Sequence, residues 1–221
     1  MADEYYGYVG TLLKVDLTNM TVEKIPTDTY DLDKWIGGRG LGSIIQWTEC
    51  DPSAGALDPE NVLTFLTGPV TGTMLDGGRT FVQAVSPAGY PDTGSFARSS
   101  FGSSFAPEMK FAGYDGIIFK GKAPYPVYFY INDDIAEIRD ARDLWGMDNF
   151  AVQNELYRRS GNKAKIASIG PAGEHMSMFS TILSDESSAT GMGSFGAVMG
   201  SKNLKAISIQ GSGSVKVADP Q

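Results

Sequence analysis

The sequence predicts an α+β protein built from two packed β-sheets and a few short helices, with an internal pseudo-twofold repeat. Short apolar runs of strand character recur along the 221 residues. Glycine is abundant, at 27 residues, and it gathers in clusters between those runs, where a chain turns tightly or approaches a ligand. The later part of the chain also repeats motifs of the earlier part. We therefore expect one large domain with a substantial core.

The first half of the chain is expected to open with a β-hairpin that Pro26 ends, because proline cannot donate to a strand ladder. Asp31 or Asp33 can cap the short helix that follows. A loop that carries glycine is expected between the last two strands of this half. The elements predicted in this half are strands at 8–17, 21–25, 62–66, 80–85 and 114–120, and helices at 41–48 and 105–111.

The second half is expected to begin with an exposed hairpin whose tip is Asp133-Asp134. An amphipathic helix follows, with Phe150, Val152 and Leu156 facing inward. Residues 1–211 would form the domain, and 212–221 a tail or linker. The elements predicted in this half are strands at 127–132, 135–139, 165–169, 178–183 and 206–210, a helix at 149–159, and a helix that ends at 202–204.

The internal repeat is visible when the chain is aligned with itself. Five matches carry it: Gly68-Pro69 with Gly170-Pro171, Phe81 with Phe179, Ser86 with Ser184, Phe101 with Phe195, and Gly121 with Gly211. The separations shrink in order along the chain, as a duplication followed by loop deletions would produce. Chance similarity between two β-rich stretches is the alternative explanation.

A true repeat would bring two equivalent glycine loops to one place. Each loop would open a helix, and the first turn of a helix offers free N–H groups and a positive dipole end to an anion. This geometry suits a ligand that is itself pseudo-symmetric and carries phosphates.

Composition excludes several classes of protein. A net charge of −8 without a basic cluster argues against nucleic-acid binding. The sequence has no apolar run of 18 residues and no secretory signal at its start, so we expect a cytoplasmic protein without a membrane span. One cysteine, Cys50, allows neither an internal disulfide nor a self-contained iron–sulfur cluster. One histidine argues against a zinc site of the Cys/His type.

The sequence resembles the aldehyde:ferredoxin oxidoreductase family along nearly its whole length. The resemblance implies the amino-terminal domain of that family, a base of two packed sheets. This base carries a tungsten atom held by two pterin dithiolenes, and a magnesium ion bridges the two pterin phosphates. The matching segments are IGGRGLGS, LDPENVLTFLTGPVTGT, FAPEMKFAGYDGIIFKGKAPYPVYFYI, EIRDARDLWG, KIASIGPAGE and FGAVMGSKNLKAI.

In the first half, the resemblance implies a set of cofactor-binding residues. Gly78 and Arg79 match a motif whose arginine contacts the pterin, and a guanidinium can bind phosphate through two parallel hydrogen bonds. Ser100 falls where the family has an asparagine whose backbone carbonyl helps to bind magnesium, and Gly102 follows in the same loop. Arg98 lies in a lengthened part of this loop and is a further candidate.

In the second half, the family reads Arg-Ala-Ala-Gly-Arg-Gly-Gly where this chain reads SATGMGS. The magnesium-binding carbonyl falls on Ala189, and the cofactor-binding positions include Ser188, Gly191 and Gly193. Both family arginines are replaced, by Ser188 and Met192. A charge-assisted hydrogen bond contributes about 1.5–3 kcal/mol, so the loss of two cations weakens the hold on phosphate.

The resemblance implies a cofactor platform of an oxidoreductase that converts aldehydes to carboxylates. The cofactor would be a tungsten or molybdenum bis-pterin, with magnesium. The 4Fe-4S cluster, its cysteines and the ferredoxin-type electron acceptor would belong to or dock on other domains, so this chain alone should be inactive. The protein then places the cofactor, and the cofactor performs the chemistry.

Two other functions remain open from the residues. A non-catalytic binding or assembly module that has lost tight pterin binding would expose an apolar face, to bind a partner or a second copy in a homodimer. A nucleotide-binding fold is suggested by the glycine pattern of 191–196, but the acid expected about 20 residues later is missing, because Gln210 and Gly211 occupy that region.

Overall fold

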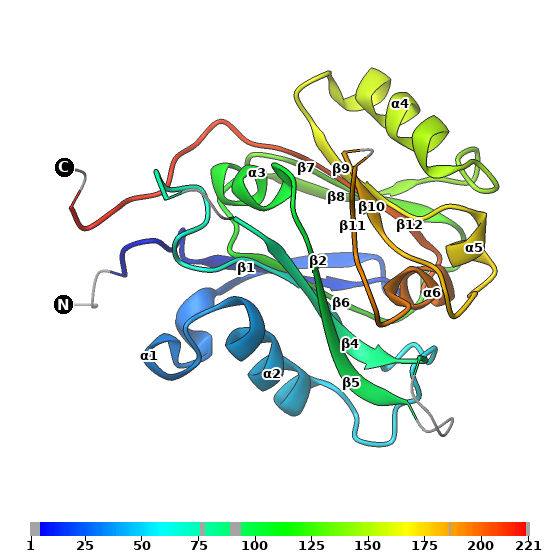
Figure 1. Cartoon of the computed structure of the whole chain (residues 1–221), viewed down its shortest axis with the longest axis horizontal. Helices are drawn as coiled ribbons and strands as arrows, with labels where there is room; N and C mark the ends of the chain where they lie inside the picture. Colours follow the sequence, from blue (N-terminus) through cyan, green and yellow to red (C-terminus); the bar gives the residue numbers. More distant parts are fainter. Residues whose placement is uncertain (1–4, 76–77, 89–93, 186, 220–221) are drawn as a thin grey trace.

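Two six-stranded mixed sheets form the protein (Figure 1). The computed structural model describes residues 5–75, 78–88, 94–185 and 187–219. The first sheet has the order β2-β1-β6-β3-β4-β5 and the second the order β11-β10-β9-β12-β7-β8. The strands are β1 (Thr11–Asp16), β2 (Thr21–Pro26), β3 (Leu63–Leu66), β4 (Thr80–Ser86), β5 (Ser95–Phe101), β6 (Gly116–Lys120), β7 (Val127–Asn132), β8 (Ile135–Asp140), β9 (Lys165–Ser168), β10 (Leu183–Ser184), β11 (Ser188–Ala189) and β12 (Leu204–Gln210).

Helices cover the outer faces of the sheets and fill the space between them. Helix α2 packs on β3 and β4, and α4 packs on β9 and β12. The short helices α3 and α6 cross over, because α3 contacts β12 and β9 of the second sheet and α6 contacts β4 of the first. The helices are η1 (Thr27–Thr29), α1 (Leu32–Trp35), α2 (Gly38–Glu49), α3 (Phe105–Phe111), α4 (Asn149–Ser160), α5 (Pro171–Glu174) and α6 (Phe195–Ser201).

The internal repeat is present in the topology and is longer than the sequence comparison indicated. It starts at the hairpin β1–β2, whose counterpart is β7–β8, and continues through α2 and α4. Strands β3, β4 and β5 then correspond to β9, β10 and β11, helix α3 to α6, and β6 to β12. Strand directions agree as well, because β1 is parallel to β6 as β7 is to β12. In Figure 1, α2 lies opposite α4 across the centre of the molecule, and α3 lies opposite α6.

Strand register corrects the sequence alignment inside the repeat. Phe65 pairs with Val82 in the first sheet, and its counterpart Ala167 pairs with Ser184 in the second. Val82 is therefore equivalent to Ser184, and the matches of Phe81 with Phe179 and of Ser86 with Ser184 are wrong. The strand expected at 178–183 also shrinks to the two residues of β10, and the side chain of Phe179 is 94% exposed.

The starts of the short helices correct one further match in the repeat. Phe105 and Phe195 each begin a short helix, so Phe195 corresponds to Phe105 rather than to Phe101. The matches at the two Gly-Pro pairs and at Gly121 and Gly211 are confirmed by their positions after equivalent strands. Most of the change in offset falls between β4 and β5, whose connection is long, whereas β10 and β11 are joined by a tight turn. A further change of one residue falls between these strands and the short helices α3 and α6.

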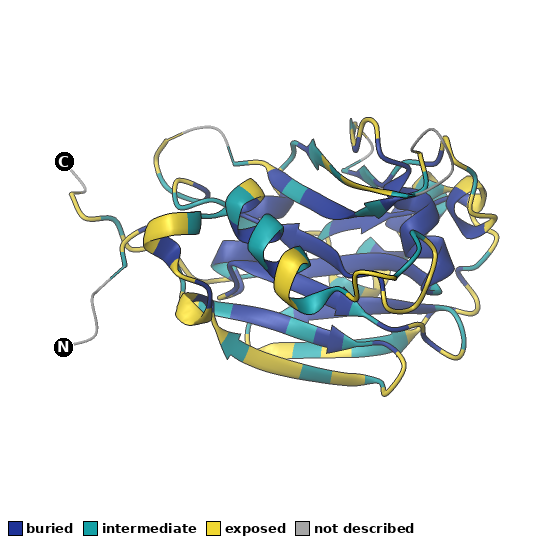
Figure 2. Ribbon diagram, turned by 90° about the horizontal axis from the view of Figure 1, so that it is seen from below, coloured by how far each residue is buried: buried dark blue, intermediate teal, exposed yellow. Residues whose placement is uncertain are grey.

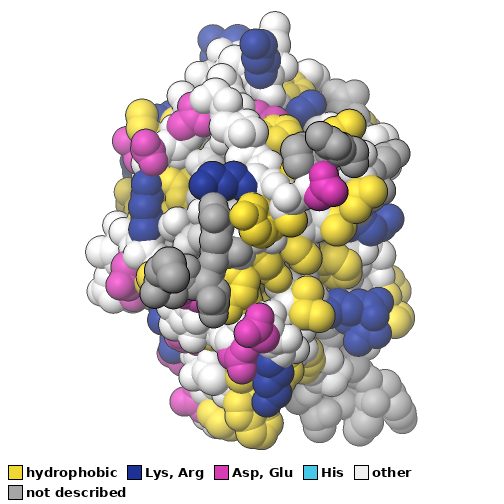
Figure 3. Space-filling model, turned by 90° about the vertical axis from the view of Figure 1, so that its left-hand side faces the viewer, with side chains coloured by type: hydrophobic (Ala, Val, Ile, Leu, Met, Phe, Trp, Pro, Cys, Tyr) yellow, Lys and Arg dark blue, Asp and Glu magenta, His cyan; other side chains and the backbone are white. Residues whose placement is uncertain are grey.

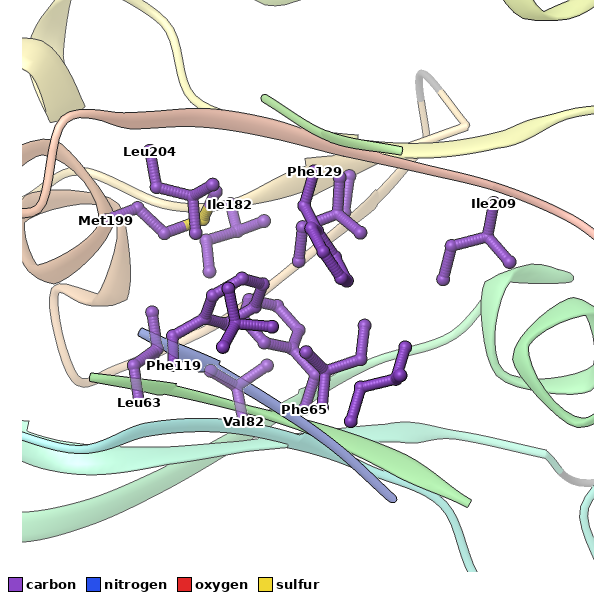
Figure 4. Packing of buried hydrophobic residues seen from close by; sticks show 14 of the residues in the cluster. Leu63, Phe65, Val82, Phe119, Phe129, Ile182, Met199, Leu204 and Ile209 are labelled. Atoms are coloured by element: carbon purple, nitrogen blue, oxygen red, sulfur yellow. The ribbon is translucent and has the colours of Figure 1, made fainter. Parts of the chain in front are cut away.

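The main core lies between the sheets. Phe119 of the first sheet packs edge to face against Phe65 of the same sheet and against Phe129 of the second sheet, and the ring centroids of Phe119 and Phe129 lie 5.4 Å apart (Figure 4). Such pairs add to the free energy gained by burying apolar area. Figure 2 shows buried residues along the inner strands, and exposed ones gather on edge strands such as β2.

Several predicted elements need correction. Strand β5 occupies part of the segment that was expected to be a glycine loop. The segment can be a strand although it is polar, because β5 lies at the edge of the sheet. The hairpin β7–β8 is exposed only on β8, since β7 lies between β8 and β12. Phe150 faces outward and is 54% exposed, whereas Val152 and Leu156 are buried as predicted. Asp31 caps α1 as predicted, because its side chain accepts a hydrogen bond from Lys34 N.

Residues 211–219 contain neither helix nor strand but lie against the domain. The N–H of Gly213 donates to the carbonyl oxygen of Phe111, and the N–H of Gly7 donates to that of Lys216. These bonds bring both ends of the described chain to one side of the molecule (Figure 1).

Candidate functional site

The edge strands β5 and β11 bring the two halves together at one point. The N–H of Gly191 donates to Ser99 Oγ at 2.9 Å. A Cβ atom built on Gly102 would lie 3.5 Å from Ser188 Oγ. The polar segments of the two halves therefore converge on one place, as the sequence predicted.

Register makes the contacting residues equivalent to one another. Ser99 pairs with Val82 and Ser188 with the equivalent Ser184, so Ser99 corresponds to Ser188. By the same register Ser100 corresponds to Ala189 and Gly102 to Gly191. The two residues that the resemblance assigned to magnesium thus occupy the same position in the two halves.

A cavity of about 400 Å³ opens at this junction. It contains five of the nine residues that the sequence singled out, together with three that it missed. We call it the arginine recess, and its lining residues are Arg39, Arg79, Phe81, Arg98, Ser99, Ser100, Ala189 and Gly191.

Three different elements supply the three arginines of this recess. Arg39 lies in the first turn of α2, Arg79 directly precedes β4, and Arg98 lies on β5. Arg79 Nε donates to Ser100 Oγ at 3.0 Å, and its Nη2 lies 3.5 Å from the Ser100 carbonyl oxygen. This carbonyl oxygen therefore faces the recess.

The recess is electropositive although the chain as a whole is acidic, at −8. All three arginines are exposed, and no carboxylate in the described part of the chain forms an ion pair with any of them. Guanidinium groups bind oxyanions through charge-assisted, often paired hydrogen bonds. The recess is therefore suited to a phosphate group.

Four predicted site residues do not line the recess. Ser188 and Gly102 form the junction between the halves. A Cβ atom on Gly78 would lie 3.1 Å from Thr71, so this glycine allows close packing. Gly193 has φ +122°, and its carbonyl oxygen accepts a hydrogen bond from Ser86 Oγ at 2.8 Å. Gly78 directly precedes Arg79 of the recess, whereas Gly193 contacts Ser86 at the other end of β4.

The short helices contribute less than the sequence predicted. No described residue of α3 or α6 lines the recess, and the N–H of Phe105 donates to Ser103 Oγ at 3.2 Å. The strands and the start of α2 line it instead. Arg39 was missed as a site residue, although it stands between two glycines and follows a glycine just as Arg79 does.

A metal at this junction would depend on main-chain oxygens. Within the described ranges, no three His, Cys, Asp or Glu side chains cluster as a metal site. The carbonyl groups of Ser100 and Ala189 are hard oxygen donors of the kind that magnesium accepts, and phosphate oxygens can complete its coordination. The donor set therefore fits magnesium together with a phosphorylated ligand.

The fold and the sequence together define the family of this chain. The family described as aldehyde ferredoxin oxidoreductase, N-terminal domain, matches residues 12–211, and the chain belongs to it. Two relatives are the tungsten-containing aldehyde ferredoxin oxidoreductases of Pyrococcus abyssi and Pyrococcus furiosus, each 44% identical over 97% and 98% of this chain respectively. An aliphatic sulfonate oxidoreductase, WOR-like subunit, of Pyrococcus furiosus is 41% identical over 94% of this chain. The chain spans 35% of the length of each of these relatives.

A solved structure has the same fold. It is a chain of the active-site complex BamBC of benzoyl coenzyme A reductase in complex with 1,5-dienoyl-CoA. The TM-score is 0.92 and the identity is 40%, over 97% of this chain and 32% of that chain. Both comparisons place the chain among oxidoreductase domains. No described helix is long and apolar enough to cross a membrane.

Proposed function

We propose that this chain is the cofactor platform of an oxidoreductase and binds a tungsten or molybdenum bis-pterin. The observation that carries the proposal is the arginine recess at the junction of the two halves. It contains three arginines that form no ion pair with a carboxylate among the described residues. It also contains Ser100 and Ala189, which occupy equivalent positions in the two halves. A ligand with two similar halves and phosphate groups matches both features.

The residues of the recess would divide the work of binding. Arg79 and Arg98, together with Arg39, would bind phosphate oxygens, and the carbonyl groups of Ser100 and Ala189 would hold magnesium. Gly102 and Gly191 would keep the backbone of both halves close to the ligand. The metal–pterin group supplies the two-electron chemistry when bound, while this chain binds and orients it.

The complete reaction is proposed from the relatives. Two of them are named as tungsten-containing aldehyde ferredoxin oxidoreductases, which supports oxidation of an aldehyde to a carboxylate with a ferredoxin-type acceptor. A 4Fe-4S cluster would lie on domains that this chain does not contain. We place the enzyme in the cytoplasm.

A second function is favoured by the exposed apolar loops. The segments that follow the two Gly-Pro pairs both expose large apolar side chains, and the face near the chain ends shows a hydrophobic patch (Figure 3). The exposed residues of these segments are Val70, Met74, Leu75, Met176, Met178 and Phe179. A non-catalytic assembly module would use such surfaces to bind partner domains or a second copy of itself.

Metal analysis of the purified chain distinguishes the two functions. We expect tungsten or molybdenum at about one atom per chain or per assembly, together with pterin fluorescence after release of the cofactor. Arg79→Gln should lower both, and Arg158→Gln, an exposed arginine on α4 far from the recess, should change neither. Absence of metal and pterin from the unchanged chain, even when produced with its gene neighbours, would support the assembly module.

A further inference from the structure

The start of α2, which carries Arg39, is held against β4 by a buried glutamine. Gln83 lies on β4 and is fully buried. Its Nε2 donates a hydrogen bond to the carbonyl oxygen of Gly38 at 3.1 Å. Gly38 directly precedes Arg39, which lines the arginine recess. The amide of Gln83 thus bonds the backbone one residue away from a recess arginine, although Gln83 itself does not line the recess.

Two glycines of α2 make room for this contact. A Cβ atom on Gly42 would overlap Gln83 Nε2, so glycine at this position leaves space for the amide. Gly38 has φ +45°, and a Cβ atom there would lie 2.8 Å from the ring of Phe81, which lines the recess. Phe81 and Gln83 are two residues apart on β4 and therefore lie on the same face of the sheet. Both side chains of this face set how closely the start of α2 approaches β4.

The second half places its buried amide on the helix instead of the strand. The fifth residue of α2 is Gly42, whereas the fifth residue of α4 is Gln153, which is also fully buried. The Nε2 of Gln153 donates to Ser168 Oγ at 3.3 Å and to the Leu183 carbonyl oxygen at 3.2 Å, and both acceptors belong to strands. The repeat thus packs helix on sheet with the amide on either side. In the first half the amide is directed at the start of the helix.

Stability alone does not account for an amide at position 83. The Oε1 atom of Gln83 is buried and has no hydrogen-bond partner in the described part of the chain. A buried polar atom without a partner lowers stability, and an apolar side chain of similar shape avoids that loss. The Nε2 atom, in contrast, fixes the backbone that leads into Arg39.

We infer that Gln83 is a positioning residue of the proposed cofactor site. It holds the start of α2 at a fixed distance from β4, so that the guanidinium of Arg39 reaches the same oxyanion as that of Arg79. Gln83 does not touch the ligand and acts through Arg39. The inference rests on the proposed function for the role of Arg39 in binding phosphate oxygens.

A double-variant cycle tests whether Gln83 acts through Arg39. The probe is inorganic sulfate, titrated calorimetrically into the full chain at low ionic strength. Gln83→Met keeps the length of the side chain but removes the hydrogen bond, and it should weaken sulfate binding about fivefold. In a chain that already carries Arg39→Gln, the same change should have no further effect, because residues that act through one another are not additive.

Gln153→Met is the matched control, since it removes an equally buried amide from the other half. Sulfate affinity should fall for Gln83→Met and stay unchanged for Gln153→Met. Urea unfolding measures the stability of each variant separately, so a general loss of stability is not mistaken for a loss of positioning. Gln83→Leu repeats the test with a smaller side chain if Gln83→Met does not fold.

Three results would overturn the inference. They are an unchanged sulfate affinity in Gln83→Met, an equal weakening with and without Arg39→Gln, and the absence of sulfate binding by the unchanged chain. Metal and pterin content separate the inference from the proposed function. Coupling between Gln83 and Arg39 in a chain that never acquires metal or pterin would contradict only the proposed function, whereas additive effects in a metal-loaded chain would contradict only the inference.

Discussion

The two halves share one topology, but one pair of equivalent buried positions carries charges of opposite sign. The carbonyl oxygen of Asp115 accepts a hydrogen bond from the N–H of Thr67, and that of Lys205 accepts one from Ile169, so Asp115 and Lys205 are equivalent. Asp115 pairs with Lys110, whereas Lys205 pairs with Glu174. The repeat therefore conserves the place of an ionic anchor and not its charge.

The partners of these residues are exchanged in a complementary way. Lys110 is the sixth residue of α3, and the sixth residue of α6 is Gly200. Gly200 has no side chain, so α5 can approach α6 closely and supply Glu174. In the first half Gly72 contacts the Lys110 stem, at 3.3 Å from a built Cβ atom. In each half, the position that faces the large charged residue, Lys110 or Glu174, is thus a glycine, Gly72 or Gly200.

The charged pair of the first half supports more of the structure than that of the second. The Asp115 carboxylate accepts hydrogen bonds from Val9 N, Gly10 N and Thr27 Oγ1, besides contacting Lys110. Glu174 accepts hydrogen bonds from Gly146 N, and Lys205 donates to the Met147 carbonyl oxygen. Burial lowers the pKa of Lys110 and of Lys205, and the carboxylate partner opposes that effect in each case.

The largest expected effect is that of Asp115→Asn. This change leaves the buried ammonium group of Lys110 without a counter-charge, and breaking a buried pair in this way costs about 3–5 kcal/mol. Urea unfolding followed by circular dichroism measures the loss. Glu174→Gln should also destabilise the fold, but by less than Asp115→Asn. A loss below about 1 kcal/mol for Asp115→Asn would show that the pair does not anchor the first half.

Double variants sharpen this comparison. Lys205→Met with Glu174→Leu removes both charges of the second half and should recover much of the stability that Glu174→Gln loses, because replacement of a buried pair by apolar groups can be neutral. Lys110→Met with Asp115→Leu should recover less, because three donors around Asp115 remain unsatisfied. Equal recovery in the two halves would contradict this difference.

The next effect concerns Lys202, the C-cap residue of α6, whose counterpart in the first half is Ala112, the C-cap residue of α3. Burial lowers the pKa of Lys202 from 10.5 to about 8. The unfolded chain then holds this proton more tightly than the folded chain, so the free energy of unfolding should rise as the pH increases from about 8 to about 10.5. The rise can reach about 2–3 kcal/mol. Lys202→Met should abolish it, as urea unfolding at pH 7.5, 8.5 and 9.5 would show, and an unchanged pH slope would refute this assignment.

The fold could be predicted because its strands are short apolar runs bounded by glycine, and because the repeat left Gly-Pro pairs at equivalent places. Strand β5 could not be recognised in the same way. Its residues SFARSSF are mostly polar, because it is an edge strand whose open side faces the arginine recess. The two-residue strands β10 and β11 depend on register with β9, which local sequence does not specify.

The candidate site was predictable only in part for a similar reason. The family resemblance had already suggested that Ser100 and Ala189 are equivalent, and strand pairing gives the same equivalence. Arg39 is distant from both in the sequence, and the packing of α2 on β4 brings it to the recess. Phe150 was expected to face inward because it is large and apolar, but the start of α4 lies at an open recess.

A smaller effect is expected for Gly200→Ala. The added methyl group would overlap the carbonyl oxygen of Gly173, so α5 would have to move away from α6. Overpacking of this kind costs about 1–3 kcal/mol. Gly68→Ala is the matched control, because a Cβ atom there meets nothing within 4 Å, and it should change the free energy of unfolding by less than about 0.5 kcal/mol. Equal losses for the two variants would show that close packing of α5 on α6 does not depend on Gly200.

The smallest effect separates the starts of α2 and α4. Asp148 caps α4 by accepting from the N–H of Ala151, whereas its counterpart Gly37 gives α2 no side-chain cap. Asp148→Ala should therefore cost about 1 kcal/mol of stability, as loss of an N-cap usually does. Gly37→Asp should bring no gain, because a Cβ atom there would lie 3.0 Å from the Thr67 carbonyl oxygen. Urea unfolding of both variants measures this. A stabilising Gly37→Asp would mean that α2 can move away from Thr67, and the arginine recess would then be less rigid than the packing of Gly37 implies.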